Sequence, residues 1–362
     1  MQRYSGNPII TPADITPSAP GMEVVGAFNA AATRFRDEIL LLLRVAERPI
    51  TTDPDSVAFP LIEEKDGRSV LRRVEVRRTD PDVDASDPRA VVYKGCTYLS
   101  SISHLRLARS HDGYHFTIDP KPTILPSGLY ERYGIEDPRI SQIGDTYWIT
   151  YTSVSELGIT VSAITTQDWV NFQRRGVCLP PENKDVAIIP GILEAAASTG
   201  VGSSAHRYAM LHRPYTQSLG STPDIWLAYS PDLVHWGEHY HVAGVRPRQW
   251  DSVRIGAGAP PLLTPDGWLE LYHGANETNT YCLGLLLLDR TEPHRVLARS
   301  KEPFLAPSAP YEKSGFFGNV VFSCGWVAQD DGRIFLYYGA ADESTAVAET
   351  SLAEAFAHLG LS

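Results

Sequence analysis

The chain has 362 residues, 43% of them hydrophobic, a formal net charge of −11 at pH 7 and four cysteines. This composition is that of a folded globular protein, and the negative charge argues against nucleic acid as a partner, because phosphate backbones are bound by basic surfaces. The sequence has no apolar stretch long enough to span a bilayer and no secretion signal after Met1, so we expect a cytoplasmic protein that does not bind membranes. The cysteines lack the close spacing of metal ligands, and we expect no bound metal.

Alternating apolar residues, followed by a tight turn and a second strand, recur along the chain. The turns are marked by Asp145, His206, Asp266 and Asp331, at intervals of 61, 60 and 65 residues. Such a period indicates one supersecondary unit used repeatedly, and its length suits a four-stranded sheet with one long loop. Closing five such units radially leaves few exposed strand edges. We therefore predict an all-β fold, a five-bladed β-propeller that forms a single domain over residues 1–362.

The first repeat is longer than the others, because its turn precedes the next by 108 residues. We expect an insertion in the first blade at about residues 47–88, in which the arginine-rich segment 68–78 forms a solvated hairpin. At the other end of the chain, Ser351 and Glu354 have the spacing of a capping box, which predicts a short C-terminal helix.

The first strand of each predicted blade begins with polar residues and continues with apolar ones. These strands are expected at residues 28–35, 136–143, 184–193, 254–263 and 318–327. In a propeller the first strands line the central axis, so their polar ends should meet in one pocket. The residues expected there are Asn29, Asp137, Lys184, Asp185, Arg254 and Asn319. A single such residue could simply satisfy backbone groups at a strand end, but charges gathered from all blades are costly to bury unless they serve a ligand.

Motifs in all five repeats resemble those of glycoside hydrolase family 130, which comprises mannoside phosphorylases and β-mannosidases. They are FNAAATRF from Phe28, GIEDPR from Gly134, KDVAIIP from Lys184, LHRP from Leu211, SPDLVHWG from Ser230, IGAGAPP from Ile255, GNVVFSCG from Gly318 and YYGAADE from Tyr337. The resemblance runs from Asn7 to about Asp342 and implies a five-bladed propeller. It also implies cleavage of β-mannosidic bonds with inversion, which needs an acid on the leaving-group side and a nucleophile on the opposite face of the sugar.

The resemblance implies roles for individual residues as well. Asp137, in the motif EDPR, matches the catalytic acid, which in this family is thought to act through a sugar hydroxyl. Asn29, Arg44 and Asp342 match residues that hold the sugar, as expected for groups that make directional hydrogen bonds to hydroxyls. The other residues expected to bind substrate are Lys184, Asp185, His212, Arg213 and His273. In a phosphorylase, the basic members of this set would bind phosphate.

The sequence departs from the family at the residues that would bind or activate the nucleophile. The loop TSVSELG offers Glu156 about where phosphorylases of this family tend to place an arginine, and a carboxylate there would repel phosphate. Ile189-Pro190-Gly191 replaces the usual Phe-Pro-Glu, which makes Glu194 a second candidate base. We therefore predict hydrolysis of β-linked manno-oligosaccharides, with β-1,2-linked chains as the expected substrates. Glu156 or Glu194 would activate the water, and no cofactor would be needed.

Other functions stay open at this stage. A β-mannoside phosphorylase would release mannose 1-phosphate and use inorganic phosphate as a co-substrate. A related five-bladed arabinan- or fructan-type glycosidase would need three carboxylates, which Asp137, Asp185 and Glu194 could supply. A non-catalytic sugar-binding propeller would have no use for the acid at Asp137. The sequence does not decide whether the chain forms a homo-oligomer.

Overall fold

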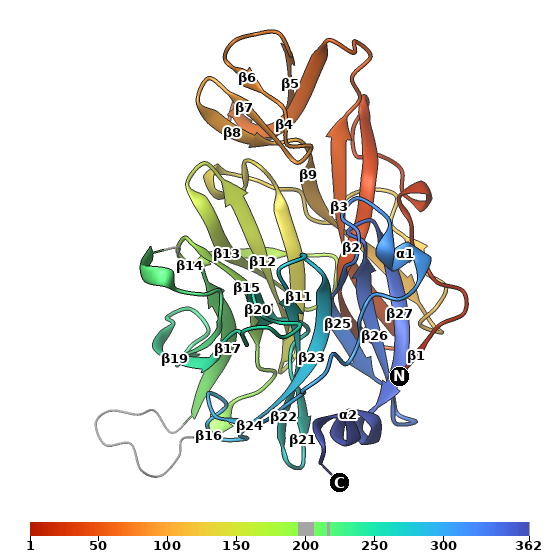
Figure 1. The fold of residues 1–362 in the computed structure, drawn as a ribbon, viewed down its shortest axis with the longest axis vertical. Helices are drawn as coiled ribbons and strands as arrows, with labels where there is room; N and C mark the ends of the chain where they lie inside the picture. Colours follow the sequence, from red (N-terminus) through yellow and green to blue (C-terminus); the bar gives the residue numbers. More distant parts are fainter. Residues whose placement is uncertain (195–205, 216–217, 362) are drawn as a thin grey trace.

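The computed structural model describes residues 1–194, 206–215 and 218–361. Within these residues the fold is nearly all-β, with only short helices (Figure 1). The strands form five antiparallel sheets of four or five strands and two smaller sheets. No helix of the described part is long and apolar enough to cross a membrane.

The five larger sheets follow one another along the chain and are called sheets 1 to 5. Sheet 1 contains β2 (Met22–Phe35), β3 (Glu38–Pro49), β9 (Ile102–Ser110) and β10 (Thr117–Ile118). Sheet 2 contains β11 (Ile135–Ile143), β12 (Thr146–Ser155), β13 (Gly158–Thr166) and β14 (Gln173–Leu179). Sheet 3 contains β15 (Asn183–Ile188), β16 (Leu193–Glu194), β17 (His206–Pro214), β18 (Ile225–Ser230) and β19 (Gly237–Ala243).

Sheets 4 and 5 complete this series. Sheet 4 contains β20 (Arg254–Ala257), β21 (Leu262–Thr264), β22 (Gly267–Ala275), β23 (Tyr281–Leu288) and β24 (Val296–Arg299). Sheet 5 contains β25 (Val321–Ala328), β26 (Arg333–Ala340), β27 (Ser344–Ser351) and β1 (Gln2–Arg3). Because β1 pairs with β27, the first strand of the chain completes the last sheet. In every sheet the strand that comes first after the preceding sheet lies at one edge, and these edge strands are β2, β11, β15, β20 and β25.

Apolar cores lie between successive sheets. Four of them join sheet 1 to 2, 2 to 3, 3 to 4 and 4 to 5, and a fifth joins sheet 5 back to sheet 1. The run of four leucines in β3 shows how one strand serves two cores. Leu40 and Leu42 pack in the core shared with sheet 2, whereas Leu41 and Leu43 pack in the core shared with sheet 5. Because successive side chains of a strand point to opposite faces, a strand buried on both faces is apolar throughout.

The insertion in sheet 1 is longer than the predicted 47–88. It occupies the whole segment between the end of β3 at Pro49 and the start of β9 at Ile102, and it projects from one end of the molecule (Figure 1). Its strands are β4 (Ser56–Lys65), β5 (Arg68–Arg77), β6 (Val83–Asp84), β7 (Ala90–Tyr93) and β8 (Cys96–Leu99). The arginine-rich segment forms β5 of the β4–β5 hairpin, as predicted. The predicted end of the insertion, at about residue 88, was too early because the strands β7 and β8 have the same alternating pattern as the strands of the larger sheets.

The helices are few and short. The predicted C-terminal helix is α2 (Leu352–Leu359), and Ser351 caps it by accepting a hydrogen bond from the backbone N–H of Glu354 at 3.2 Å. A second helix, α1 (Pro310–Lys313), was not predicted. Single 3₁₀ turns occur at Pro12–Asp14, Leu129–Glu131 and Ser218–Gly220.

Candidate active site

Polar residues of the edge strands β2, β11, β15 and β20 meet in one pocket of about 400 Å³. Its described lining residues are Asn29, Arg44, Arg89, Glu136, Asp137, Lys184, Asp185, Arg213, Arg254, His273, Asn279, Tyr281, Phe316, Phe317, Val320, Phe322 and Asp342. Of the residues expected to bind substrate, the structure places Asn29, Arg44, Lys184, Asp185, Arg213, His273 and Asp342 in this pocket, together with the expected acid Asp137. Asn319 was expected here as well, but its side chain is exposed and is not among the lining residues.

A break in strand pairing turns three of these polar residues toward the pocket. Asn29, Asp137 and Asp185 each lie where the register shifts between the edge strand and its neighbour, and their φ angles are 49°, 50° and 56°. A β-bulge of this kind redirects a side chain, and a positive φ outside glycine is costly enough to suggest a functional constraint. Two glycines leave room beside them, since a Cβ at Gly339 would lie 2.1 Å from Asn29 Oδ1 and one at Gly256 would lie 2.4 Å from Asp185 Oδ2.

Asp137 lies between an amide and a guanidinium group. Asn29 Nδ2 donates a hydrogen bond to Asp137 Oδ1 at 2.9 Å, and Arg44 Nη1 contacts the same oxygen at 3.0 Å. Arg44 also contacts Glu136 at 2.8 Å. Burial by itself would raise the pKa of Asp137, but Arg44 and Arg139 outweigh it and hold the pKa below its ordinary value. The acid is therefore ionised in the unliganded pocket.

The pKa of Asp342 is shifted in the opposite direction from that of Asp137. Burial raises its pKa from 3.8 to about 7; Arg44 opposes the rise, and the neighbouring carboxylates of Asp137 and Glu136 add to it. Like charges around one arginine do not all ionise easily, so Asp342 keeps its proton in part of the molecules near neutral pH. We call Glu136, Asp137 and Asp342 the acidic wall of the pocket.

Three cations of the pocket come from neighbouring strands of sheets 3 and 4, and we call Lys184, Arg213 and Arg254 the basic wall. These strands are β15, β17 and β20. Arg254 Nη1 donates to the hydroxyl of Tyr281 at 3.0 Å. Guanidinium and ammonium groups gathered in this way are the groups that proteins use to bind phosphate.

Asp185 forms ion pairs that position Arg213 of the basic wall. Its carboxylate is buried and pairs with Arg139 Nη2 at 3.2 Å and with Arg213 Nε at 2.6 Å. Burial would raise its pKa, but Arg213 and then His273 hold it well below the ordinary range. His273 Nε2 lies 3.5 Å from the same carboxylate, and burial lowers the pKa of this histidine to about 3, so its ring is neutral.

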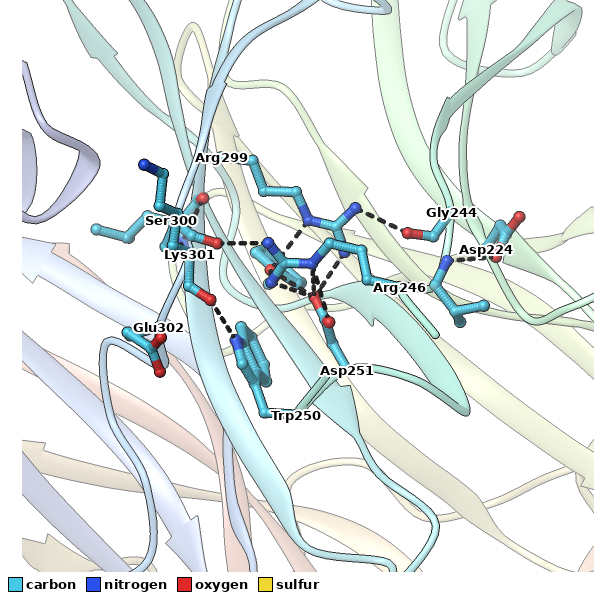
Figure 2. Close-up of polar contacts among 12 residues, drawn as sticks. Asp224, Gly244, Arg246, Trp250, Asp251, Arg299, Ser300, Lys301 and Glu302 are labelled. Carbon is cyan, nitrogen blue, oxygen red and sulfur yellow. Dashed lines mark hydrogen bonds and ion pairs between the residues drawn. The ribbon is translucent and has the colours of Figure 1, made fainter. Parts of the chain in front are cut away.

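A second charged cluster anchors the segment that leads into β20. Figure 2 shows Arg246 and Arg299 converging on the fully buried carboxylate of Asp251, at 2.8 and 2.7 Å. The hydroxyl of Tyr272 donates to the same carboxylate at 2.9 Å, and Trp250 stacks on Tyr272. Trp250 also donates from Nε1 to the carbonyl oxygen of Lys301 (Figure 2). These contacts fix the backbone at Asp251, three residues before Arg254. The network therefore helps to position Arg254 of the basic wall.

Neither candidate base is among the described lining residues of the pocket. Glu156 lies in the turn between β12 and β13, is partly exposed and pairs with Arg132. It is not among the described lining residues. Glu194 lies in β16 opposite His206, seven residues along β17 from Arg213, which is roughly 20 Å in an extended strand. The side chain of Glu194 lies outside the described part of the structure.

His212 also differs from expectation. It is the neighbour of Arg213 in β17, and alternation turns it to the opposite face of the sheet. There it lines a separate cavity of about 780 Å³ with His239, Trp226 and Trp236. Its Nε2 lies 3.1 Å from His239 Nδ1, and burial lowers the pKa of His212 to about 3. His212 is therefore not among the described residues that line the pocket of Asp137, and its predicted role in substrate binding stays a prediction.

Several lining residues were not predicted. Glu136 precedes the acid in the motif EDPR, so its position in the sequence could have indicated it. Arg89 comes from the insertion, and Tyr281 and Phe316 come from loops or strand starts, where no local pattern marks them. They reach the pocket only through the packing of distant segments.

Comparison with known proteins identifies the family. The family model Glyco_hydro_130, described as β-1,4-mannooligosaccharide phosphorylase, matches residues 85–359. The chain belongs to glycoside hydrolase family 130. It is therefore an enzyme of β-mannoside cleavage, of the glycoside phosphorylase or glycosidase type.

Individual relatives in family 130 differ in how much of the chain they resemble. The β-1,2-mannobiose phosphorylase of Listeria innocua is 44% identical over 358 residues, which cover 98% of this chain and 97% of the relative. Its structure in complex with β-1,2-mannobiose superposes with a TM-score of 0.90 over 99% of each chain. The 1,2-β-oligomannan phosphorylase of Thermoanaerobacter sp. is 39% identical over 254 residues, covering 69% of this chain and 79% of the relative. A family 130 structure described with hydrolases of β-1,2 linkages in Candida mannan is 22% identical, with a TM-score of 0.71 over 97% of this chain and 94% of that one, and shares the fold.

Proposed function

We propose that the protein is a phosphorylase that cleaves β-1,2-linked mannosides with inorganic phosphate and releases mannose 1-phosphate. The observation that carries this proposal is the basic wall of Lys184, Arg213 and Arg254, which shares one pocket with the acid Asp137. Inorganic phosphate is a dianion near neutral pH, and its binding needs several cations within reach of the anomeric carbon. The relatives with 44% and 39% identity, which are named as phosphorylases of β-1,2-linked mannosides, support the same reading.

This proposal replaces the predicted hydrolysis. An inverting hydrolase needs a free carboxylate to activate water on the face opposite the acid. Glu156 pairs with Arg132 outside the pocket, and the backbone of Glu194 lies at the far end of sheet 3. Among the described lining residues, Asp185 is the carboxylate on the side of the basic wall, and two arginines already occupy it. These contacts among the described residues support phosphate rather than water as the nucleophile.

The acidic and basic walls suggest separate roles for the pocket residues in the reaction. The mannosyl group to be transferred lies between them, where Asn29, Arg44 and Asp342 hold its hydroxyls. Phosphate on the basic wall attacks the anomeric carbon while Asp137 delivers a proton toward the departing sugar oxygen, through a sugar hydroxyl of the substrate. Asp137 has to gain this proton, since it is ionised in the unliganded pocket. Lys184 is one of the cations that lower its pKa, so phosphate bound at Lys184 favours protonation of Asp137.

The experiment is product analysis with β-1,2-mannobiose in the presence and absence of phosphate. We expect mannose 1-phosphate, detected by ³¹P NMR, only when phosphate is supplied. Release of free mannose at the same rate without phosphate would overturn the proposal. β-1,4-Mannobiose serves as the control for linkage, and we expect slower cleavage of it.

We also infer that the five sheets are the blades of one five-bladed β-propeller over residues 1–362. The core between sheets 5 and 1 supports a closed ring, because it joins the last sheet to the first. Pairing of β1 with β27 supports it as well, since the chain ends then meet in one blade. The cytoplasmic location stays a prediction.

A further inference from the structure

A groove of about 340 Å³ adjoins the catalytic pocket. It lies between the edge of sheet 1 and the insertion. Its described lining residues are Glu23, Val25, Arg48, Pro49, Thr51, Ser56, Val57, Ala58, Arg78, Pro88, Ser100, Ser101 and Phe316. Phe316 lines the groove and the pocket alike, and Pro88 of the groove is followed by Arg89 of the pocket. The two cavities therefore meet at Phe316 and the turn 87–89.

The loop that carries Phe316 is held rigidly at this junction. Phe317 N donates to the carbonyl oxygen of Ala341 at 2.9 Å. Gly315 lies so close to the same residue that a Cβ there would come within 2.7 Å of Ala341 Cβ. Although this packing fixes its backbone, the side chain of Phe316 stays 41% exposed. An exposed aromatic ring on a fixed loop between two cavities is suited to contact the apolar face of a sugar ring.

The opposite side of the junction is also fixed. Ser100 N donates to the carbonyl oxygen of Arg89 at 2.9 Å, and Ser100 Oγ donates to that of Pro88 at 2.7 Å. Asp87 holds the guanidinium of Arg89 through two contacts, at 3.1 and 2.9 Å. The passage between pocket and groove is thus formed before any ligand binds, which lowers the entropic cost of binding there.

The chemistry of the groove matches a carbohydrate. Glu23 and Arg48, which pair with each other at 2.5 Å, and the hydroxyl groups of Thr51 and Ser101 offer hydrogen-bond donors and acceptors. Its position matches the leaving-group side of the reaction. Inversion puts phosphate and the leaving group on opposite faces of the transferred sugar, and the basic wall belongs to sheets 3 and 4 whereas the groove belongs to sheet 1.

We propose that this groove binds the mannosyl residues beyond the scissile bond, so that the enzyme prefers β-1,2-manno-oligosaccharides of three or more residues to the disaccharide. This inference rests on the proposed function for the linkage and for the direction of the chain. It goes beyond that function by assigning a binding site outside the catalytic pocket and a preference for substrate length.

Binding and turnover test the proposal separately. Calorimetric titration of β-1,2-mannobiose and β-1,2-mannotetraose into the enzyme without phosphate measures the contribution of the groove whatever the reaction is. We expect the tetraose to bind about tenfold more tightly, the effect of one or two additional hydrogen bonds. The ratio of kcat/KM for the two substrates with phosphate should change in the same direction.

Two variants and a control locate the effect. Thr51→Trp fills the groove. Arg48→Ala removes a polar side chain from the groove and replaces the first variant in the test if Thr51→Trp does not fold. Either should bring the ratio of the two affinities close to one. Val170→Trp adds the same ring at a site in sheet 2 that is 75% exposed, and it should leave the ratio unchanged. Equal affinity of the wild-type enzyme for both sugars would overturn the inference, whereas free mannose as the product would overturn only the proposed function.

Discussion

Asp342 is the carboxyl group whose ionisation the pocket most clearly controls, and replacing it with asparagine tests that control. Burial, with the carboxylates of Asp137 and Glu136, raises its pKa to about 7 despite the opposing effect of Arg44. In the unfolded chain the same carboxyl group ionises near 3.8. Its pKa is therefore higher in the folded state, and the folded protein binds this proton more tightly than the unfolded chain does.

The sign and size of the effect follow from this difference. The stabilising contribution of Asp342 is present in full below about pH 4, the pKa of the unfolded chain, and is lost as the pH rises through 7. The difference between 3.8 and about 7 would correspond to about 4 kcal/mol for a fully buried group. Asp342 is only half-buried, and solvent in the pocket screens it, so we expect about 1–2 kcal/mol. Asparagine cannot ionise, so Asp342→Asn should not show this loss.

Thermal denaturation at pH 5.5 and 8.5 measures the effect. About half of the difference between the two pKa values lies between pH 5.5 and 7, so we expect the Tm of the wild-type protein to fall between these pH values by about 1–3 °C more than the Tm of Asp342→Asn. Asp66→Asn is the matched control, because Asp66 is an exposed turn residue with nearly the same backbone conformation, φ 51° against 52°. Its pH dependence should equal that of the wild type. An equal loss of Tm in all three proteins would show that Asp342 is already ionised at pH 5.5, and the reasoning would fail.

Four further predictions concern single residues. Asp137→Asn should lower the rate of phosphorolysis by about a hundredfold to ten-thousandfold with an unchanged Tm, because the amide cannot deliver a proton; near-normal turnover would remove it from the mechanism. Arg254→Met should raise the KM for phosphate more than the KM for mannobiose, and an equal rise in both would argue against the basic wall as the phosphate site. Glu156→Gln should keep phosphorolysis within about threefold, since surface ion pairs contribute little; a large loss would restore it as the base. Asp251→Asn should reduce the free energy of unfolding by about 3–5 kcal/mol, because two arginines lose their buried carboxylate, and a Tm within 1–2 °C of the wild type would contradict this.

The repeated sheets could be predicted because strand periodicity is local. Alternation, turn residues and a near-constant interval are all written within each repeat. Sheets 2, 3 and 4 begin within one residue of the predicted starts, whereas sheet 1 begins six residues earlier and sheet 5 three residues later. The polar starts of the edge strands were also visible, and so the sequence indicated Asn29, Asp137, Lys184 and Asp185 as one group. It did so because edge strands of similar repeats occupy equivalent positions, which brings their ends together in any arrangement that packs the sheets in a ring.

The tertiary structure decided which neighbours of these residues share the pocket. His212 and Arg213 are adjacent in the chain, but the face that each side chain takes depends on the register of β17 with β15. Arg89 and Phe316 lie far apart in sequence and meet only because the insertion packs over sheet 1.

The identification of the nucleophile also depended on contacts that the sequence does not show. Glu156 looked like a free base in the sequence, and its ion pair with Arg132 could not be read from its own loop. Periodicity predicted the sheets and the position of Asp137 in the pocket, because these depend on the pattern within each repeat, whereas its role as the acid came from the family resemblance. The pairing of charges in space is what supports phosphate over water in the proposed reaction, because the chemistry of a buried carboxylate is set by the groups that surround it.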